Sequence, residues 1–165
     1  MKKLYIVRHA KSDRDIPELP DFERPLNMRG RLDAAIMGEH LKNSGLVPDI
    51  MVSSPANRAL ATARLLADHL GYPLNKIQVE EKIYEAWRED LVDVLKKLDD
   101  HSLSAMIIGH NPGLQLLAAS LTEFPYENIP TCSIVAIELQ IDAWEEIKEQ
   151  CGKFLFFDFP KKLKS

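Results

Sequence analysis

Short apolar runs alternate along this chain with longer segments whose apolar residues recur at helical spacing. The runs are rich in β-branched and other apolar side chains, which predicts buried or half-buried strands. Six strands are expected, at residues 4–7, 49–53, 77–80, 105–108, 133–139 and 154–157.

The segments between these runs carry the signals that begin and end helices. One helix is expected to begin near Met28 and to end at Ser44-Gly45. In the next, Ser54 is expected as the N-cap, Pro55 as the first helical residue and Gly71 as the stop. Three further helices are expected, around residues 91–98, 114–121 and 143–150.

Strands that alternate with helices favour an α/β fold whose mostly parallel sheet is covered on both faces. We therefore expect a three-layer α/β/α sandwich. The sequence shows no internal repeat, linker or low-complexity segment, so one domain over residues 1–165 is the simplest interpretation. Residues 11–25 are rich in proline and acidic side chains, which predicts a surface loop of a length that is often functional.

Charge and composition narrow the choice of partner. The formal net charge of −4 argues against general nucleic-acid binding, which depends on clustered positive charge. No stretch approaches the ~20 apolar residues of a membrane span. Cys132 and Cys151 are expected to be reduced thiols of a cytoplasmic protein. Neither the cysteines nor the five histidines show metal-ligand spacing, so no metal or other cofactor is expected.

Basic residues that can bind an anion stand at the ends of the predicted strands. Arg8 and His9 follow the first strand, and His110 follows the strand 105–108. Arg58 lies one turn into the helix that Ser54 opens. In open α/β sheets ligands bind outside the carboxyl ends of the strands, where helix N-termini add their dipoles. Arginine presents a planar fork of donors that suits phosphate, so we expect a phosphate pocket.

Each of these residues also has a structural interpretation when it is taken alone. A histidine at a strand end is often a satisfied core residue, Arg58 suits a surface cation, and residues 109–113 suit an ordinary strand-to-helix turn. That turn also lacks the spacing of a phosphate-binding P-loop. The joint pattern of two arginines and two histidines at one edge of the sheet favours the pocket.

The same motifs carry a family resemblance. Arg8-His9-Ala-Lys-Ser resembles the Arg-His-Gly signature of the histidine phosphatase superfamily, with alanine in place of glycine. Ser53-Ser54-Pro55 with Arg58 resembles the second motif of that family, and Gly109-His110 resembles the third. The segment Leu26-Asn27-Met28-Arg29-Gly30 is similar to the small SixA-type phosphohistidine phosphatases. The resemblance implies the phosphoglycerate-mutase-like fold, but the chain has no room for the helical insertion of the mutases.

The resemblance also implies roles for individual residues. His9 matches the nucleophile that accepts the phosphoryl group, and Arg8 and Arg58 match the clamp on its oxygens. His110 matches the second histidine, which donates to the same oxygens. Arg24 matches a further pocket arginine of the SixA-type group. Glu85 matches the position of a proton donor, although an exposed glutamate at a helix start is an equal interpretation.

These residues together predict a metal-independent phosphatase that works through a phosphohistidine intermediate. The resemblance implies that the substrate is a phosphohistidine in a protein. A phosphatase of a small phosphate ester, such as a sugar phosphate or nucleotide, is the alternative. A non-catalytic phosphate-binding module is a third interpretation, which the complete set of Arg8, His9, Arg58 and His110 disfavours. The expected partner is therefore a phosphorylated protein or a small phosphorylated metabolite.

Overall fold

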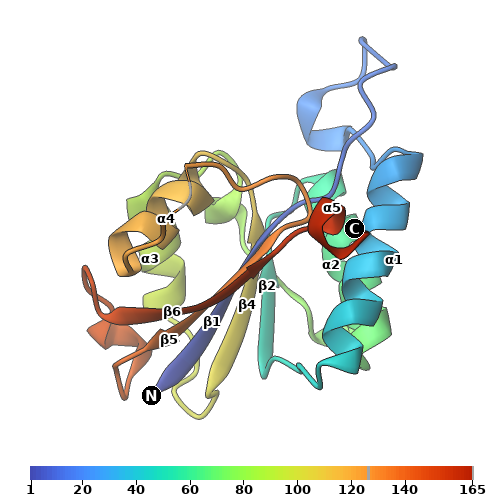
Figure 1. Ribbon diagram of the computed structural model, residues 1–165. Helices are drawn as coiled ribbons and strands as arrows, with labels where there is room; N and C mark the ends of the chain where they lie inside the picture. The colour runs from blue at the N-terminus through green and yellow to red at the C-terminus, as the bar shows by residue number, and fades with distance from the viewer. Residues whose placement is uncertain (126, 165) are drawn as a thin grey trace.

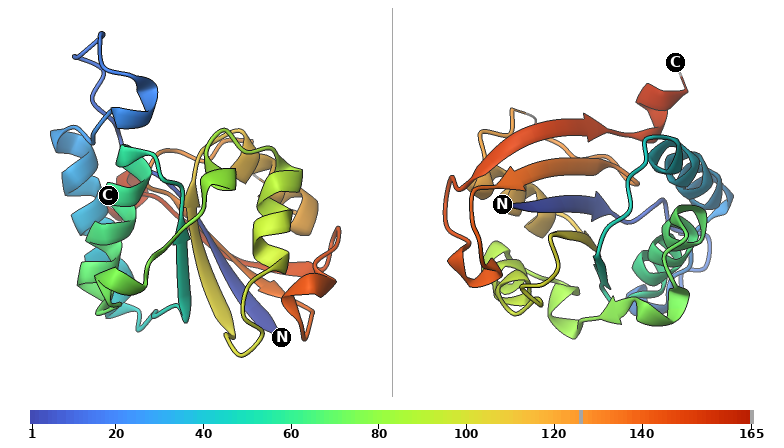
Figure 2. Two further views of the ribbon diagram at one scale, coloured as in Figure 1. Left: turned by 180° about the vertical axis from the view of Figure 1, so that it is seen from behind. Right: turned by 90° about the horizontal axis from the view of Figure 1, so that it is seen from below.

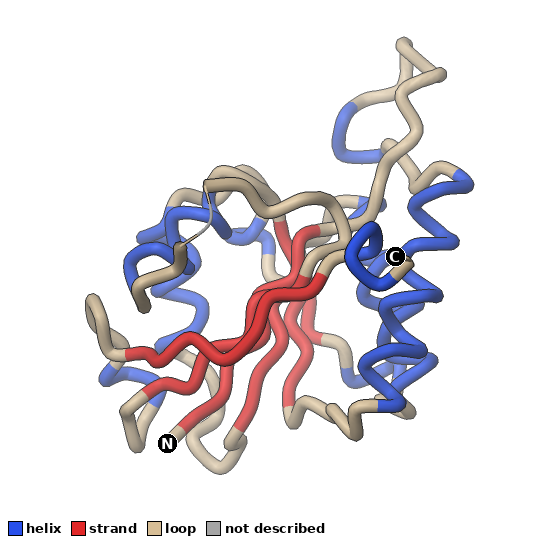
Figure 3. The backbone as a smooth tube through the Cα atoms, viewed as in Figure 1, coloured by secondary structure: helices blue, strands red, loops and turns tan. Residues whose placement is uncertain are grey.

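The structure is a computed structural model that describes residues 1–125 and 127–164. The described residues form a central six-stranded sheet with helices against both faces (Figure 1). The tube view separates the same three layers by colour, with the strands between two groups of helices (Figure 3). The predicted three-layer α/β fold is thus confirmed. Of the single domain expected over residues 1–165, Tyr126 and Ser165 lie outside the described residues.

The strands follow the order β3-β2-β4-β1-β5-β6 across the sheet. Their bounds are β1 Lys2–Arg8, β2 Ile50–Ser53, β3 Gln78–Val79, β4 Ser104–Gly109, β5 Ile134–Leu139 and β6 Gly152–Asp158. Each of these strands lies on one of the predicted apolar runs, with ends that differ by a few residues.

The prediction of a mostly parallel sheet is only partly confirmed. The pairs β1–β4, β2–β4 and β2–β3 are parallel, whereas β5 runs antiparallel to both β1 and β6. Twelve residues, 140–151, join β5 to β6, and they contain only the 3₁₀ helix Trp144–Glu146. A parallel pair needs a crossover connection that is usually an α-helix, and this segment holds no α-helix, so β5 and β6 pair antiparallel. Composition alone does not reveal this reversal.

Helices α1 (Met28–Asn43), α2 (Asn57–Leu70) and α5 (Pro160–Leu163) lie on one face of the sheet. Helices α3 (Arg88–Lys96) and α4 (Gly113–Leu121) lie on the other (Figure 2). The two faces form separate hydrophobic cores because successive side chains of a strand point to opposite faces.

Strand β1 shows this alternation directly. Leu4 and Ile6 belong to the core beneath α3 and α4, and Val7 belongs to the core beneath α1 and α2. All three side chains are completely buried, so β1 is held from both sides at the centre of the sheet. The end of β1 is therefore a rigid place from which to present a functional side chain.

Helix α2 begins later than the sequence predicts. Its first residue is Asn57 and its N-cap position is Ala56, so Ser54 is not the cap and Pro55 is not the first helical residue. Ser54 instead ends the strand segment: its backbone N–H donates to the Ile108 carbonyl at 3.0 Å. Its hydroxyl points to another partner, which belongs to the site described below.

The C-terminal part differs from the prediction in two places. The helix expected at residues 143–150 is reduced to the 3₁₀ turn Trp144–Glu146, because Trp144 anchors the segment as a completely buried side chain. The short helix α5 was not predicted. It packs against α1, where Lys164 forms an ion pair with Asp33 at 2.7 Å.

The register of the parallel strands brings three chain segments to one edge of the sheet. Arg8 at the end of β1 pairs with Gly109 at the end of β4, and Ser53 at the end of β2 pairs with Ile108. Residues 9, 54 and 110 therefore leave the sheet side by side. The loop 11–25 rises above the same edge (Figure 1).

Candidate active site

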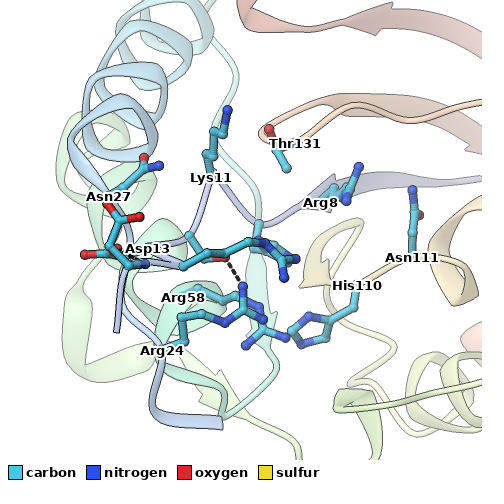
Figure 4. Close-up of a pocket in the computed structure, with 13 residues that line it drawn as sticks. Arg8, Lys11, Asp13, Arg24, Asn27, Arg58, His110, Asn111 and Thr131 are labelled. Atoms are coloured by element: carbon cyan, nitrogen blue, oxygen red, sulfur yellow. Dashed lines mark hydrogen bonds between the residues drawn. The ribbon is translucent and has the colours of Figure 1, made fainter. Parts of the chain in front are cut away.

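A cavity of about 530 Å³ opens at this edge of the sheet (Figure 4). It is lined by all of the residues that the sequence assigned to the phosphate pocket except Glu85, namely Arg8, His9, Arg24, Arg58 and His110. Five basic side chains line it, namely Arg8, Lys11, Arg14, Arg24 and Arg58, against two acidic ones, Asp13 and Asp15. The excess of positive charge suits an anionic ligand.

His9 lines this cavity and is held in place by neighbouring backbone groups. Its backbone N–H donates to the Gly109 carbonyl at 3.1 Å, which continues the β1–β4 pairing by one residue. Its ring Nδ1 lies 2.7 Å from the Ala10 carbonyl oxygen. A carbonyl can only accept, so Nδ1 carries the proton and Nε2 keeps a lone pair. The residue is 8% exposed, so this tautomer is fixed in a largely dry place.

Both histidines of the site are neutral at physiological pH. The pKa of His9 is lowered to about 4, chiefly by burial and further by Arg58, Arg8 and Arg24, although the bond to Ala10 opposes the shift. The pKa of His110 is lowered to about 3, again chiefly by burial and then by the charges around it. The two rings lie 5.1 Å apart between centroids. A neutral imidazole with a free lone pair is a nucleophile, so His9 has the right protonation state.

The arginines Arg8 and Arg58 present donors to the same cavity. Arg8 Nη1 donates to the Ile129 carbonyl at 2.8 Å, which fixes the direction of its guanidinium. Arg58, in the first turn of α2, is only 6% exposed. The Nε atoms of both arginines are buried and have no hydrogen-bond partner within residues 1–125 and 127–164. Unpaired buried donors are costly, and a phosphoryl oxygen would satisfy them.

His110 approaches from the end of β4. A hydrogen bond of 2.8 Å joins its Nε2 to the Ser54 hydroxyl, which also accepts from the Ala56 backbone N–H at 3.2 Å. Its Nδ1 is buried and without a partner in the part of the chain that the structure describes. Ser54, expected as a helix cap, therefore orients this histidine instead. Figure 4 shows the guanidinium groups of Arg24 and Arg58 converging beside the His110 ring.

The remaining two predicted residues differ in their placement. Arg24 lies on the loop 11–25 and reaches the cavity, where its Nη1 donates to the Ser12 hydroxyl. Glu85 is exposed, in a left-handed backbone conformation with φ of 57°, between Tyr84 and the start of α3. It lines an adjoining hollow together with His110 and Asn111 rather than the main cavity. The catalytic roles of all these residues stay predictions.

Sequence reasoning missed several residues of the site. Asn111 lines the cavity and its Nδ2 donates to the Ile129 carbonyl at 3.1 Å. Its place directly after His110 was a usable signal. Lys11 and Thr131 also line the cavity, and Asp21 contacts two of its arginines. No local pattern marks Asp21 among the acidic residues of its loop, because its contacts depend on how that loop folds back.

Neither a metal centre nor a membrane segment is visible in the described residues. Within residues 1–125 and 127–164, no three His, Cys, Asp or Glu side chains are grouped so that they could hold a metal ion. No helix in that part of the chain is long and apolar enough to span a membrane.

An α/β sandwich with neutral histidines and arginines around one strand-end cavity provides a site that suits a phosphoryl group. The model of the histidine phosphatase superfamily (branch 1) matches residues 4–87, and the chain belongs to that superfamily. The matched segment includes Arg8, His9 and Arg58. Membership supports a phosphatase with a phosphorylated substrate.

One curated protein and two solved structures are similar to this chain over most of its length. An uncharacterized chloroplastic protein of Arabidopsis thaliana is 28% identical over 153 residues, which cover 88% of this chain and 70% of the relative. The structure of the protein histidine phosphatase SixA complexed with tungstate has a TM-score of 0.82 at 22% identity, covering 98% of this chain and 99% of that one. A mycobacterial glucosyl-3-phosphoglycerate phosphatase has a TM-score of 0.65 at 18% identity, covering 93% and 97%. The chain thus shares its fold with both.

Proposed function

We propose that this protein is a metal-independent phosphatase that transfers a phosphoryl group to His9 and then to water, and that its substrate is a phosphohistidine in another protein. The observation that carries the proposal is the fixed tautomer of His9, whose Nδ1–H is held by the Ala10 carbonyl at 2.7 Å. The Nε2 lone pair is then the one nucleophile on this ring inside a cavity lined by arginines.

The reaction divides into two displacements at phosphorus. In the first, a bond forms between His9 Nε2 and phosphorus while the bond from phosphorus to the leaving nitrogen breaks, and the departing imidazole, already protonated on its other ring nitrogen, leaves as a neutral group. In the second, water attacks the phosphorus of the phosphoenzyme. The bond between phosphorus and His9 Nε2 breaks, the protons of the water stay on the inorganic phosphate or pass to solvent, and neutral His9 is restored.

The donors around the cavity stabilise the charge that develops on the phosphoryl oxygens. The transition state of phosphoryl transfer is loose and spreads charge over three equatorial oxygens, so catalysis depends on positioning and electrostatics. Arg8 and Arg58 each offer an unpartnered buried Nε–H. When the Ser54 hydroxyl donates to His110 Nε2, the Nδ1–H of His110 is left to donate as well.

The exposure of the acidic side chains near the cavity supports phosphohistidine as the substrate. An imidazole that is already protonated leaves as a neutral group, whereas an alkoxide must be protonated as it departs. Glu85 is exposed and stands beside the main cavity rather than in it. Asp21 is occupied by two arginines. Asp13 and Asp15 line the cavity from the loop 11–25, and neither is buried. Among the described residues that line the cavity no carboxyl group is buried, which suits the leaving group that needs least assistance.

A small phosphate ester is the second candidate. Glu85 shares its hollow with His110, so a substrate that bridges the two hollows would place its leaving oxygen near this carboxyl group. The fold that the chain shares with a glucosyl-3-phosphoglycerate phosphatase is compatible with this candidate.

Glu85→Gln separates the two candidates, because it removes the acid with little change of shape. For a phosphohistidine phosphatase, the variant should hydrolyse a sugar phosphate far more slowly than wild type and a phosphohistidine peptide almost as fast. General acid catalysis contributes ~10²–10⁴ in rate, so the difference is measurable. Glu81→Gln, an exposed glutamate at the preceding 3₁₀ turn, is the matched control and should change neither rate.

The rates of the wild-type protein complete the test. We expect phosphohistidine peptide to be preferred over a serine phosphopeptide and over sugar phosphates. A preference for one small ester that Glu85→Gln removes would establish the second candidate. Absence of turnover on a generic aryl phosphate, with binding of inorganic phosphate retained, would establish a non-catalytic module.

A further inference from the structure

Asp21 joins two arginines of the cavity, Arg24 and Arg58, to each other. It begins the 3₁₀ helix Asp21–Glu23 in the loop 11–25. One carboxylate oxygen accepts from Arg24 Nη2. The other accepts from Arg58 Nη2 at 3.1 Å and from the Tyr84 hydroxyl at 2.7 Å. Its backbone carbonyl accepts from Arg58 Nη1 at 2.8 Å.

The geometry leaves the inner donors of Arg58 available. A guanidinium has five N–H donors, and Asp21 takes one from each of the two Nη atoms of Arg58. The Nε–H and one N–H on each Nη therefore remain. Asp21 itself does not line the cavity, and its side chain is 51% exposed. It thus holds Arg58 from the outer side while the guanidinium faces the cavity.

The same carboxylate extends the network to a second arginine and an aromatic ring. Arg24 is held at two points, by Ser12 through Nη1 and by Asp21 through Nη2. The Tyr84 ring, whose hydroxyl binds Asp21, packs edge-on against His110 with centroids 5.6 Å apart. Asp21 therefore contacts three side chains. Two of them, Arg24 and Arg58, line the cavity, and the third, Tyr84, packs against His110, which also lines it.

The charge of Asp21 persists over a wide pH range. Partial burial raises its pKa, but the hydrogen bonds from Tyr84, Arg24 and Arg58 outweigh this and bring the pKa well below its usual range. In turn the pKa of Tyr84 is raised to about 12, first by burial and then by the bond to Asp21 and its charge. The carboxylate is therefore an acceptor at every pH at which the enzyme is expected to work.

We propose that Asp21 is a positioning residue that fixes Arg58 and Arg24 in the orientation in which they bind the phosphoryl group. This inference rests on the proposed function, since it takes these arginines as the phosphoryl clamp. Orientation matters because a bidentate Arg–phosphate contact depends on the plane of the guanidinium as well as on its charge. An arginine that no longer binds Asp21 keeps its charge, but the orientation of its guanidinium plane is no longer fixed.

The test compares Asp21→Asn with Glu23→Gln. Asn keeps the size of the side chain and replaces one accepting oxygen by a donor, which cannot accept from an arginine or from Tyr84. Glu23 is exposed, stands in the same 3₁₀ helix and makes none of these contacts, so it is the matched control. Turnover of an aryl phosphate and inhibition by vanadate are measured for both, with folding checked by circular dichroism.

We expect Asp21→Asn to lower kcat/KM and to raise the vanadate inhibition constant, each by about 10- to 100-fold, as when a group that orients a ligand-binding side chain is removed. Glu23→Gln should stay within twofold of wild type. Tyr84 should titrate closer to its ordinary value of about 10 in Asp21→Asn, which ultraviolet absorbance records. Tyr84→Phe, which keeps both arginine contacts, should lose less activity than Asp21→Asn.

A double-mutant cycle identifies the route of the effect. If Asp21 acts through Arg58, adding Asp21→Asn to Arg58→Lys should cost much less than it costs in the wild-type background, since residues in one network are not additive. Full additivity, or wild-type kinetics of Asp21→Asn, would overturn the inference. A gain of activity would do so too, because it would mean that Asp21 blocks the clamp. The wild-type protein tests the substrate proposal separately. If it hydrolyses an aryl phosphate but not a phosphohistidine peptide, the substrate proposal fails and the inference about Asp21 does not.

Discussion

One ring nitrogen of His9 carries the proposed chemistry, and its surroundings decide what that nitrogen does. The Ala10 carbonyl fixes the proton on Nδ1, and burial keeps the ring neutral. Both effects come from backbone and packing rather than from a partner side chain. A general base to activate the nucleophile is therefore unnecessary, since the lone pair is present in the resting protein.

His9→Ala should lower turnover of an aryl phosphate by more than ~10³-fold, because no other nucleophile stands at that place in the cavity. Brief incubation with ³²P-labelled substrate should leave an acid-labile label on wild type and none on the variant. His101→Ala is the control, since His101 is an exposed histidine at the opposite end of the sheet. An acid-stable label, or a label that survives His9→Ala, would assign the nucleophile elsewhere.

At the scale of elements, the loop 11–25 is anchored at its base and carries Arg24 and Asp21 over the cavity. Ser12 and Leu26 form an isolated antiparallel bridge, and the Asn27 backbone N–H donates to the Lys11 carbonyl at 3.0 Å. The Asn27 side chain caps α1 by accepting from the Gly30 N–H at 2.7 Å. The first turn of α1 and the base of the loop are thus one unit.

Gly30→Ala should break this unit. An added Cβ at this position would lie 2.1 Å from the Lys11 carbonyl oxygen, which is backbone and cannot turn aside. We expect the free energy of unfolding to fall by about 1–3 kcal/mol, the usual cost of overpacking, as measured by urea denaturation. Arg29→Ala, at an exposed neighbour in the same turn, should change it by less than about 0.5 kcal/mol. Equal stabilities for the two variants would contradict the close packing.

Periodicity predicts these elements well where one face of each is buried. The strands of both cores and the helices α1 to α4 follow the apolar pattern because burial decides their conformation. The pattern fails where a residue forms a hydrogen bond with a partner that is distant in the sequence. Ser54 has the chemistry of a helix cap, but His110, 56 residues away, takes its hydroxyl. Trp144 likewise binds the carbonyl of Ser102 through its indole N–H, and the predicted helix gives way to a turn.

The candidate site follows the same rule: residues in regular elements are predictable, and residues placed by contacts distant in the sequence are not. The positions of Arg8, His9, Arg58 and His110 were predictable because each stands at a strand end or at the first turn of a helix, and parallel strands bring their ends together. The contacts of Asp21 with Arg58 and Tyr84 were not, since a loop has no period that locates it. The sequence thus predicts the residues that line the cavity better than the residues that contact them from outside it.

At the scale of the whole molecule, the two buried neutral histidines couple stability to pH. The pKa values of His9 and His110 are lowered to about 4 and about 3 in the folded protein, against about 6.5 in an unfolded chain. Between these values the unfolded state binds more protons than the folded state. The free energy of unfolding is therefore fully retained above pH 6.5 and falls as the pH is lowered toward 4.

Urea denaturation between pH 7 and pH 4 measures this loss, in a buffer without phosphate or other binding anions. Each histidine contributes a slope of up to about 1.4 kcal/mol per pH unit in this window. His9→Ala should therefore show a shallower fall than wild type by up to that amount, whereas His101→Ala should follow wild type. Parallel curves for His9→Ala and wild type would mean that His9 titrates normally in the folded protein.

The contacts of Arg8 and Asp21 join segments of the chain that the ribosome synthesises at well-separated times. Arg8 binds the carbonyl of Ile129, 121 residues later, and Asp21 binds Tyr84, 63 residues later. A ribosome that adds ~5–20 residues per second must release the segment around Ile129 before Arg8 finds its partner. Every shorter nascent chain carries His9 without the contact that fixes Arg8. We therefore expect no phosphatase activity in a translating extract from products that end before Ile129.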